Sequence, residues 1–350
     1  MKVRIKTVAK ALPEYCCTTA ETLPFVRDWL KGKEDRFVRK VIKIFENAGV
    51  QKRYAIMPPE KVFSNMGFAE RNRLYAKAAI ALGEQCLSDA LAKAGWKADQ
   101  LDYIITVSCT GIMIPSLDAY LINRLGLRQD IIRLPVTEMG CAAGVSGLIY
   151  AKNFLKENPG KRAALVSVES PSATFQYHDF SMANIVSAAI FGDGAACVLL
   201  SSDPGEDGPQ ILDQGMYHFY DAEQLMGFEL TDTGLQMVLD VAVPERIADH
   251  FGQVIHPFLE ANGIAIKDID HLVFHPGGKK IIQVVESLFG ELGKDLELTK
   301  TVLGEYGNMS SATVLYVLEK FIERSPKEGD RGLMLSFGPG FSAQRILLQW

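Results

Sequence analysis

The chain has 350 residues, and its hydrophobic content of 48% is enough for a large buried core in one domain or two. The formal net charge of −5 argues against a nucleic-acid-binding protein, and no apolar run is long enough for a membrane span. The first residues lack an apolar signal core, so we expect a cytoplasmic protein. Six cysteines without a repeated C-x-x-C spacing argue against a zinc site or a disulfide framework.

Along the first half, the pattern predicts helices and then helices alternating with strands. The first 60 residues are charged and predicted to be helical, and Phe68–Ala94 is predicted as a long amphipathic helix that ends at Gly95. Beyond Gly95 we expect strands at 103–107, 131–136, 163–168 and 195–200, and helices at 117–125 and from Cys141 to about Leu155.

A polar stretch rich in Gly and Pro, 201–209, separates two halves, which we place at 1–205 and 206–350. The second half repeats the order of elements. We expect helices at 244–261, at 280–288 and from Asn308 to about Ile322, and strands at 271–274 and around Leu333 and Ile346. Strands alternating with helices predict an α/β fold with mixed sheets, in which the two halves pack together.

Three short patterns occur once in each half, and the two members of each pair are separated by nearly the same number of residues. Residues 138–141 match 305–308, residues 95–105 match 263–273, and residues 164–167 match 333–336. The first pair places Cys141 and Asn308 at equivalent positions, each opening an apolar helix. Two similar halves with polar residues at their loop ends predict a shared active site.

Cys141 is the candidate nucleophile. Its neighbours Gly140, Ala142 and Gly144 are small, which lets a substrate approach the sulfur. At the start of a helix, the free N–H groups and the helix dipole favour a thiolate and can hold an oxyanion. The competing interpretation is a buried structural cysteine, because free cysteines are among the most buried residues.

His275 and Asn308 are the candidate partners of Cys141. His275 ends a predicted buried strand and precedes a Pro-Gly-Gly turn, where functional side chains are common, although an ordinary loop histidine is the alternative. Asn308 could simply cap its helix, but the matching position in the first half is Cys141. Together the three suit thioester chemistry: the histidine pairs with the thiolate, and histidine and asparagine N–H groups stabilise an enolate oxygen.

The motifs together resemble those of type III polyketide synthases, the chalcone synthase superfamily. The resemblance rests on Gly-Cys-Ala-Ala-Gly around Cys141, His-Pro-Gly-Gly at 275–278, Gly-Asn-Met-Ser-Ser-Ala at 307–312 and Gly-Pro-Gly at 338–340, and it covers essentially the whole chain. It implies a thiolase-like duplicated fold of αβαβα layers and a homodimer. Its substrates would be an acyl-CoA starter and malonyl-CoA, with no metal and no permanently bound cofactor.

The resemblance also implies a role for each residue. Cys141 would carry the starter and the growing chain, and His275 would keep Cys141 ionised. His275 and Asn308 would bind the malonyl thioester and stabilise the enolate formed on loss of CO₂. Repeated condensation would give a polyketide that cyclises to an alkylpyrone- or resorcinol-type product.

By the same resemblance, Phe191 is a gatekeeper between the CoA tunnel and the cavity. Met237 takes the second gatekeeper position, where the plant enzymes usually have Phe, and this flexible apolar side chain favours a cavity that extends towards a fatty-acyl chain. The other cavity-lining positions are Cys109, Thr110 and Thr174, and Ile114 would reach into the partner's cavity. Lys40 and Lys43 match basic CoA-phosphate positions, Asn47 replaces the third, and Lys280 follows the His275 turn; a solvated basic face is the alternative.

Three other functions remain in competition. A β-ketoacyl synthase of fatty-acid initiation, working on acyl carrier protein, also uses Cys, His and Asn, but His-Pro-Gly-Gly rather than His-Gln-Ala-Asn favours the polyketide enzyme. A catalytically idle thiolase-fold scaffold is disfavoured by retention of all three polar residues. A papain-like protease is disfavoured by the duplicated α/β pattern.

Overall fold

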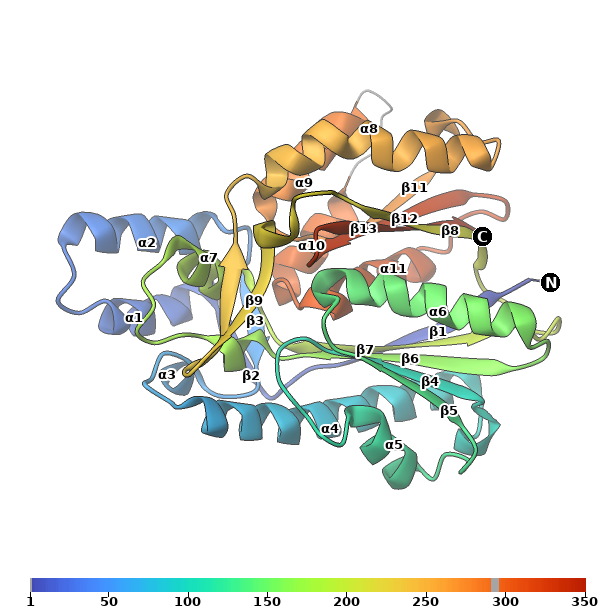
Figure 1. Ribbon diagram of the computed structural model, residues 1–350, viewed down its shortest axis with the longest axis horizontal. Coiled ribbons are helices and arrows are strands. Elements are labelled where there is room, and N and C mark those ends of the chain that lie inside the picture. Colours follow the sequence, from blue (N-terminus) through green and yellow to red (C-terminus); the bar gives the residue numbers. More distant parts are fainter. Residues whose placement is uncertain (1, 291–295) are drawn as a thin grey trace.

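One nine-stranded sheet runs through both halves of the protein in the computed structural model, which describes residues 2–290 and 296–350 (Figure 1). The strand order is β11-β12-β13-β8-β1-β7-β6-β4-β5. The strands are β1 (Arg4–Ala11), β4 (Tyr103–Val107), β5 (Ile132–Val136), β6 (Arg162–Glu169), β7 (Gly194–Ser201), β8 (Gln210–His218), β11 (His271–Phe274), β12 (Arg331–Gly338) and β13 (Ser342–Gln349).

The two halves of the sheet have the same pairing pattern. In the first half β4 and β6 are parallel, whereas β6–β7 and β7–β1 are antiparallel. In the second half β11 and β12 are parallel, whereas β12–β13 and β13–β8 are antiparallel. The halves join where β1 pairs with β8. This repetition explains the paired sequence patterns, because the two members of each pair lie in equivalent elements.

Helices pack against both outer faces of the sheet and also lie between the strands of its two halves. They are α1 (Thr19–Trp29), α2 (Asp35–Asn47), α3 (Pro59–Val62), α4 (Phe68–Ala94), α5 (Leu117–Leu125), α6 (Ala143–Glu157), α7 (Met182–Ile190), α8 (Val243–Ala261), α9 (Lys279–Gly290), α10 (Glu297–Tyr306) and α11 (Thr313–Glu323). In Figure 1, α6 and α11 lie between the two sets of strands, α4 and α5 cover one outer face, and α8 and α9 cover the other. These are the five αβαβα layers expected of a thiolase-like fold.

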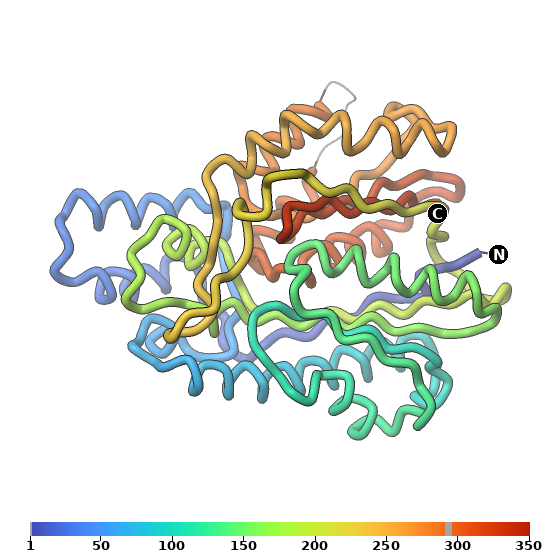
Figure 2. Tube along the Cα trace, viewed as in Figure 1, coloured from blue at the N-terminus to red at the C-terminus, as the bar shows by residue number. Residues whose placement is uncertain are grey.

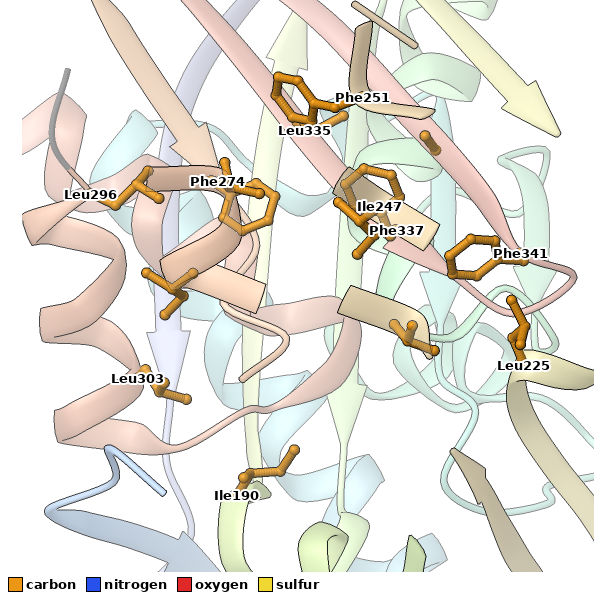
Figure 3. Packing of buried hydrophobic residues seen from close by; sticks show 14 of the residues in the cluster. Ile190, Leu225, Ile247, Phe251, Phe274, Leu296, Leu303, Leu335, Phe337 and Phe341 are labelled. Carbon is orange, nitrogen blue, oxygen red and sulfur yellow. The ribbon is translucent and has the colours of Figure 1, made fainter. Parts of the chain in front are cut away.

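The buried side chains form three clusters that follow these layers. The central cluster joins α6 and α11 to strands of both halves, and a second packs α4 against the first half. The third includes Ile247, Phe251, Phe274 and Phe337, where α8 and the strands of the second half meet (Figure 3). Apolar burial on this scale is the main force that holds the layers together.

The prediction that the first 60 residues are helical is wrong for several segments. β1 is a central strand, and β2 (Tyr15–Thr18) pairs with β3 (Lys52–Ala55) in a separate two-stranded antiparallel sheet. β1 was not recognised because its lysines break the apolar pattern of a central strand. Lys6 and Lys10 can occupy that strand because they form ion pairs with Glu206 and Glu319. β8 and a β-hairpin formed by β9 (Met226–Thr231) and β10 (Gly234–Leu239) were also not predicted.

The described ends of the chain lie on one side of the molecule, where Arg4 and Gln349 both pair with Gln210 (Figure 2). Among the helices within residues 2–290 and 296–350, none has the length and apolarity needed to cross a bilayer.

Candidate active site

Cys141 lies at the junction of the two halves, in a single 3₁₀ turn that leads into α6. Its thiol donates to the Ser310 hydroxyl at 3.6 Å, and its carbonyl accepts from Ser336 at 2.7 Å. Gly144, one turn further along, allows the second half to approach: a Cβ on this residue would lie 2.3 Å from the carbonyl oxygen of Ser311. The absent side chain therefore brings the 308–312 loop against the Cys141 turn.

Asn308 is fixed by its backbone and by its side chain. Its N–H donates to Ile190 at 2.8 Å and its carbonyl accepts from Gly192 at 3.0 Å, so the segment around Phe191 holds it in place. The side-chain oxygen accepts from the N–H of Ser310 at 2.8 Å, and the amide nitrogen donates to the Gly277 carbonyl at 3.2 Å. Asn308 does not cap α11, whose N-cap is Ala312. Its side-chain oxygen instead stabilises the turn that precedes α11, and one N–H of its amide is not used by the Gly277 contact.

His275 follows β11, as expected, and its N–H donates to Leu335 at 3.0 Å. The side chain is only 3% exposed, and neither ring nitrogen has a hydrogen-bond partner within the described part of the chain. Because Gly277 binds the Asn308 amide, the turn that carries His275 is tied to the loop that carries Asn308. An imidazole buried without a partner is ready to bond to a ligand.

Burial dominates the protonation of the site. It raises the pKa of the Cys141 thiol to about 12, although the hydrogen bonds that the sulfur makes with Ser310 and Asn308 act in the opposite direction. Burial also lowers the pKa of His275 to about 3. Burial of the sulfur therefore opposes the thiolate that the start of the helix favours, and burial of the imidazole opposes its protonation.

Glu169 is a buried carboxylate beside the site that sequence reasoning missed. It accepts from the N–H of Cys109 at 3.0 Å, from the Thr110 hydroxyl at 2.8 Å and from Ser311. Burial raises the pKa of its carboxyl group. The Cys109 sulfur lies 3.5 Å from the Ser310 hydroxyl, so that hydroxyl stands between the Cys109 and Cys141 thiols. The sequence did contain a signal for Glu169, because this acidic residue directly follows the apolar strand predicted at 163–168.

Cys141, His275 and Asn308 line one cavity of about 490 Å³, which is within the size range of small-molecule sites. The same cavity is lined by the predicted residues Phe191, Met237, Cys109, Thr110 and Lys280. A second cavity of about 70 Å³ includes Thr174, and the two cavities share Pro171, Phe191 and Met237. Thr174 therefore faces the smaller space, on the far side of these three residues.

Three predicted residues lie outside both cavities. Lys40 and Lys43 are exposed on α2, the helix whose residues Ile44 and Asn47 line the larger cavity. Ile114 is 94% exposed, so within one chain it touches neither cavity.

A half-buried thiol, a buried imidazole and a buried amide at a largely apolar cavity in a thiolase-like fold define a class of enzyme that handles acyl thioesters. Comparison with known proteins agrees with this class. Family models described as the N-terminal and C-terminal domains of chalcone and stilbene synthases match residues 2–204 and 215–350. The chain belongs to this family; it is a type III polyketide synthase and hence an acyltransferase that uses CoA thioesters.

Individual relatives cover the whole chain. It is 34% identical to a 1,3,6,8-tetrahydroxynaphthalene synthase of Streptomyces peucetius subsp. caesius, over 99% of this chain and 93% of the relative. A putative chalcone synthase of Bacillus subtilis is 28% identical, over 99% and 98%. The crystal structure of 1,3,6,8-tetrahydroxynaphthalene synthase from Streptomyces coelicolor A3(2) has a TM-score of 0.93, 29% identity and 99% coverage of both chains.

Proposed function

We propose that this polyketide synthase loads an acyl-CoA starter on Cys141, extends it with malonyl-CoA and cyclises the chain to an alkylpyrone- or resorcinol-type product. The observation that carries the proposal is the convergence of Cys141, His275 and Asn308 on one largely apolar cavity. Since its substrates are CoA thioesters, we also place the protein in the cytoplasm.

In the loading step, the Cys141 sulfur attacks the carbonyl carbon of the starter thioester. The thiol proton passes to His275, the C–S bond to CoA breaks, and the CoA thiolate takes the proton as it leaves. Transfer of this proton creates a thiolate–imidazolium pair from two uncharged groups, so neither charge has to be buried alone before a substrate arrives. The partnerless ring nitrogens of His275 support this role.

In the extension step, His275 and Asn308 donate N–H groups to the thioester oxygen of malonyl-CoA. Loss of CO₂ leaves its electron pair as an enolate, whose negative oxygen these donors stabilise. The enolate carbon attacks the acyl thioester on Cys141, a C–C bond forms, and the C–S bond to Cys141 breaks. The product is a chain lengthened by two carbons on CoA, which reloads for the next round.

The cavity walls support an alkyl starter. Met226, Phe228, Met237 and Leu239 from the β9–β10 hairpin and Ile247 of α8 line the larger cavity. Burial of successive methylene groups against such walls stabilises a fatty-acyl chain by about 0.8 kcal/mol each. The second cavity, which begins beyond Phe191 and Met237, offers further room for the chain end.

We also propose a homodimer and a basic entrance for CoA. Ile132 is exposed on β5, the edge strand of the large sheet, and Ile112 and Ile114 are exposed in the segment between β4 and α5; a partner would bury them. At the entrance, exposed Lys43 and Lys280 would bind the CoA phosphates.

Mass spectrometry of products tests this function. Purified protein is incubated with malonyl-CoA and starters from acetyl-CoA through aromatic to long-chain acyl-CoA, with Cys141→Ala as control. We expect pyrones or resorcinols that depend on Cys141 and a best starter with a long alkyl chain. Full-length product from Cys141→Ala would refute the attachment site. Activity that needs acyl carrier protein would identify a fatty-acid-type condensing enzyme instead.

A further inference from the structure

The side chain of Gln176 lies between two cavity walls that belong to different elements. It is 6% exposed, and its amide nitrogen donates to the carbonyl of Thr174 at 3.0 Å and to the carbonyl of Leu235 at 3.2 Å. A primary amide has two N–H groups, so one can serve each wall. Gln176 therefore joins the end of the 3₁₀ turn η3 (Pro171–Thr174) to strand β10.

Gln176 is itself held firmly. Its N–H donates to the side-chain oxygen of Asn184 at 3.3 Å, and its carbonyl accepts from the Asn184 amide at 2.8 Å. Asn184 lies in α7, the helix that ends at Ile190, just before Phe191. The glutamine is therefore fixed to the same rigid element that carries the gatekeeper Phe191.

The other side of the contact is the β9–β10 hairpin, a two-stranded sheet separate from the large one. Leu235 and Met237 are two residues apart on β10, so their side chains point to the same face. A second side-chain contact to this segment supports the hairpin, since Gln236 donates to Asp179 at 3.3 Å. The position of Met237 in the cavity wall thus depends on how β10 is tied to segment 176–179.

We propose that Gln176 is a positioning residue that determines which starters are accepted. This inference rests on the proposed function. Its amide fixes the distance between the Thr174 wall and β10, and so keeps Met237 in the partition between the two cavities. When the amide is lost, the carbonyls of the half-buried residues Thr174 and Leu235 lose their donor, and β10 moves towards water to satisfy the carbonyl of Leu235. The partition then opens, and the site accepts longer chains.

The test compares Gln176→Met and Gln176→Glu with the wild type. Methionine keeps the length of the side chain without donors, and glutamate keeps its shape but presents oxygens to two carbonyls. Gln253→Glu, on the exposed side of α8, is the matched control. For each protein, kcat/KM is measured with hexanoyl- to octadecanoyl-CoA, together with the melting temperature and the rate of malonyl-CoA decarboxylation.

We expect both Gln176 variants to shift the best starter to a longer chain, with the ratio of long- to short-chain kcat/KM rising about tenfold. The rate of decarboxylation, which depends on His275 and Asn308, should change by much less than tenfold. An equal loss with every starter, or an unchanged ratio in a folded Gln176→Met protein, would overturn the proposal. Gln176→Met carries the test if the glutamate variant does not fold.

If the proposed function itself is wrong, the same measurements give a different result. If the wild type condenses malonyl-CoA alone and uses no acyl-CoA starter, the alkyl starter is refuted. The role of Gln176 is then measured by the number of malonyl units in the product. Longer products from Gln176→Met would support the positioning role, and an unchanged distribution would refute it.

Discussion

Phe191 and Asn308 form an isolated parallel bridge, although they come from opposite halves of the chain. The bridge places the cavity partition next to the amide that faces the thiol, because the hydrogen bonds on either side of Phe191 are made by the main chain of Asn308. One short segment therefore positions both a cavity wall and a polar group of the site.

Replacement of Asn308 by Ala should reduce malonyl-CoA decarboxylation by about 10²–10³-fold, because one of two donors to the enolate oxygen is lost. Loading of the starter on Cys141 should change much less. Release of CO₂ and formation of the acyl-enzyme are measured separately, with the exposed Asn153→Ala as control. Equal loss in both steps would contradict a role of Asn308 mainly in stabilising the enolate.

Replacement of Ser310 by Ala should make Cys141 a weaker nucleophile. The hydroxyl stabilises the ionised sulfur across 3.6 Å, so its loss should raise the pKa of Cys141 and slow alkylation by about 3- to 10-fold. The pH dependence of iodoacetamide labelling at Cys141 measures the effect, and the exposed Ser287→Ala is the control. An unchanged labelling profile would show that the contact has no influence on the thiol.

His275 should make the fold less stable in mild acid. Its pKa is about 3 in the folded protein and near 6.5 in the unfolded chain, so below pH 6.5 only the unfolded chain gains the proton. The contribution is fully present above pH 6.5 and is lost as the pH falls towards 3. Between pH 7.5 and 5, the free energy of unfolding should fall by about 2 kcal/mol more in the wild type than in His275→Gln.

Urea denaturation at the two pH values measures this difference, and the exposed His256→Gln should behave like the wild type. Asp193 and Glu169 have raised pKa values, which oppose the trend, but they are common to all three proteins and cancel in the comparison. An identical loss of stability in wild type and His275→Gln would contradict the prediction.

Replacement of Gly144 by Ala should destabilise the protein by about 1–3 kcal/mol, the typical cost of overpacking a core, and should impair the site. The new Cβ would lie 2.3 Å from the Ser311 carbonyl oxygen, a backbone atom that cannot move without its loop. Gly252→Ala in α8 is the control, since its nearest contact is an ordinary 3.4 Å to His256. Thermal unfolding and condensation rates distinguish the two, and equal stability would contradict the close approach.

Replacement of Ile114 by Asp should weaken the proposed dimer, because a charge would replace an apolar side chain that a partner is expected to bury. Sedimentation velocity over a range of concentrations measures the association. Tyr220→Asp is the control, since Tyr220 is also exposed and lines neither cavity. A wild-type protein that sediments as a monomer throughout would refute the homodimer.

The elements with a strong local pattern were predictable from the sequence. The helix Phe68–Ala94 begins and ends where the amphipathic pattern and Gly95 placed it, and the strand before His275 is also where it was expected. The shared cavity of Cys141, His275 and Asn308 followed from the duplication and the motifs. These features depend on residues that are close in sequence or repeated in it.

The missed features depend on contacts between distant segments. β1 was hidden because the partners of its lysines lie far along the chain, at Glu206 and Glu319. The protonation of Cys141 could not be predicted either, because a helix start is visible in the sequence but burial of the sulfur is not. Gln176 gave no signal, since its partners are backbone carbonyls of two other segments.

The position of β1 beside β8 has a consequence for the order of synthesis. The first half leaves the ribosome with β1 as an open edge, and the side of α6 that packs against α11 and β13 stays uncovered until the second half follows. This nascent half is therefore prone to aggregation, and we expect chaperones to protect it until the last strands are made. The larger cavity is lined by residues of both halves, so it forms only after the second half has packed against the first. A ribosome-bound first half therefore cannot begin polyketide synthesis.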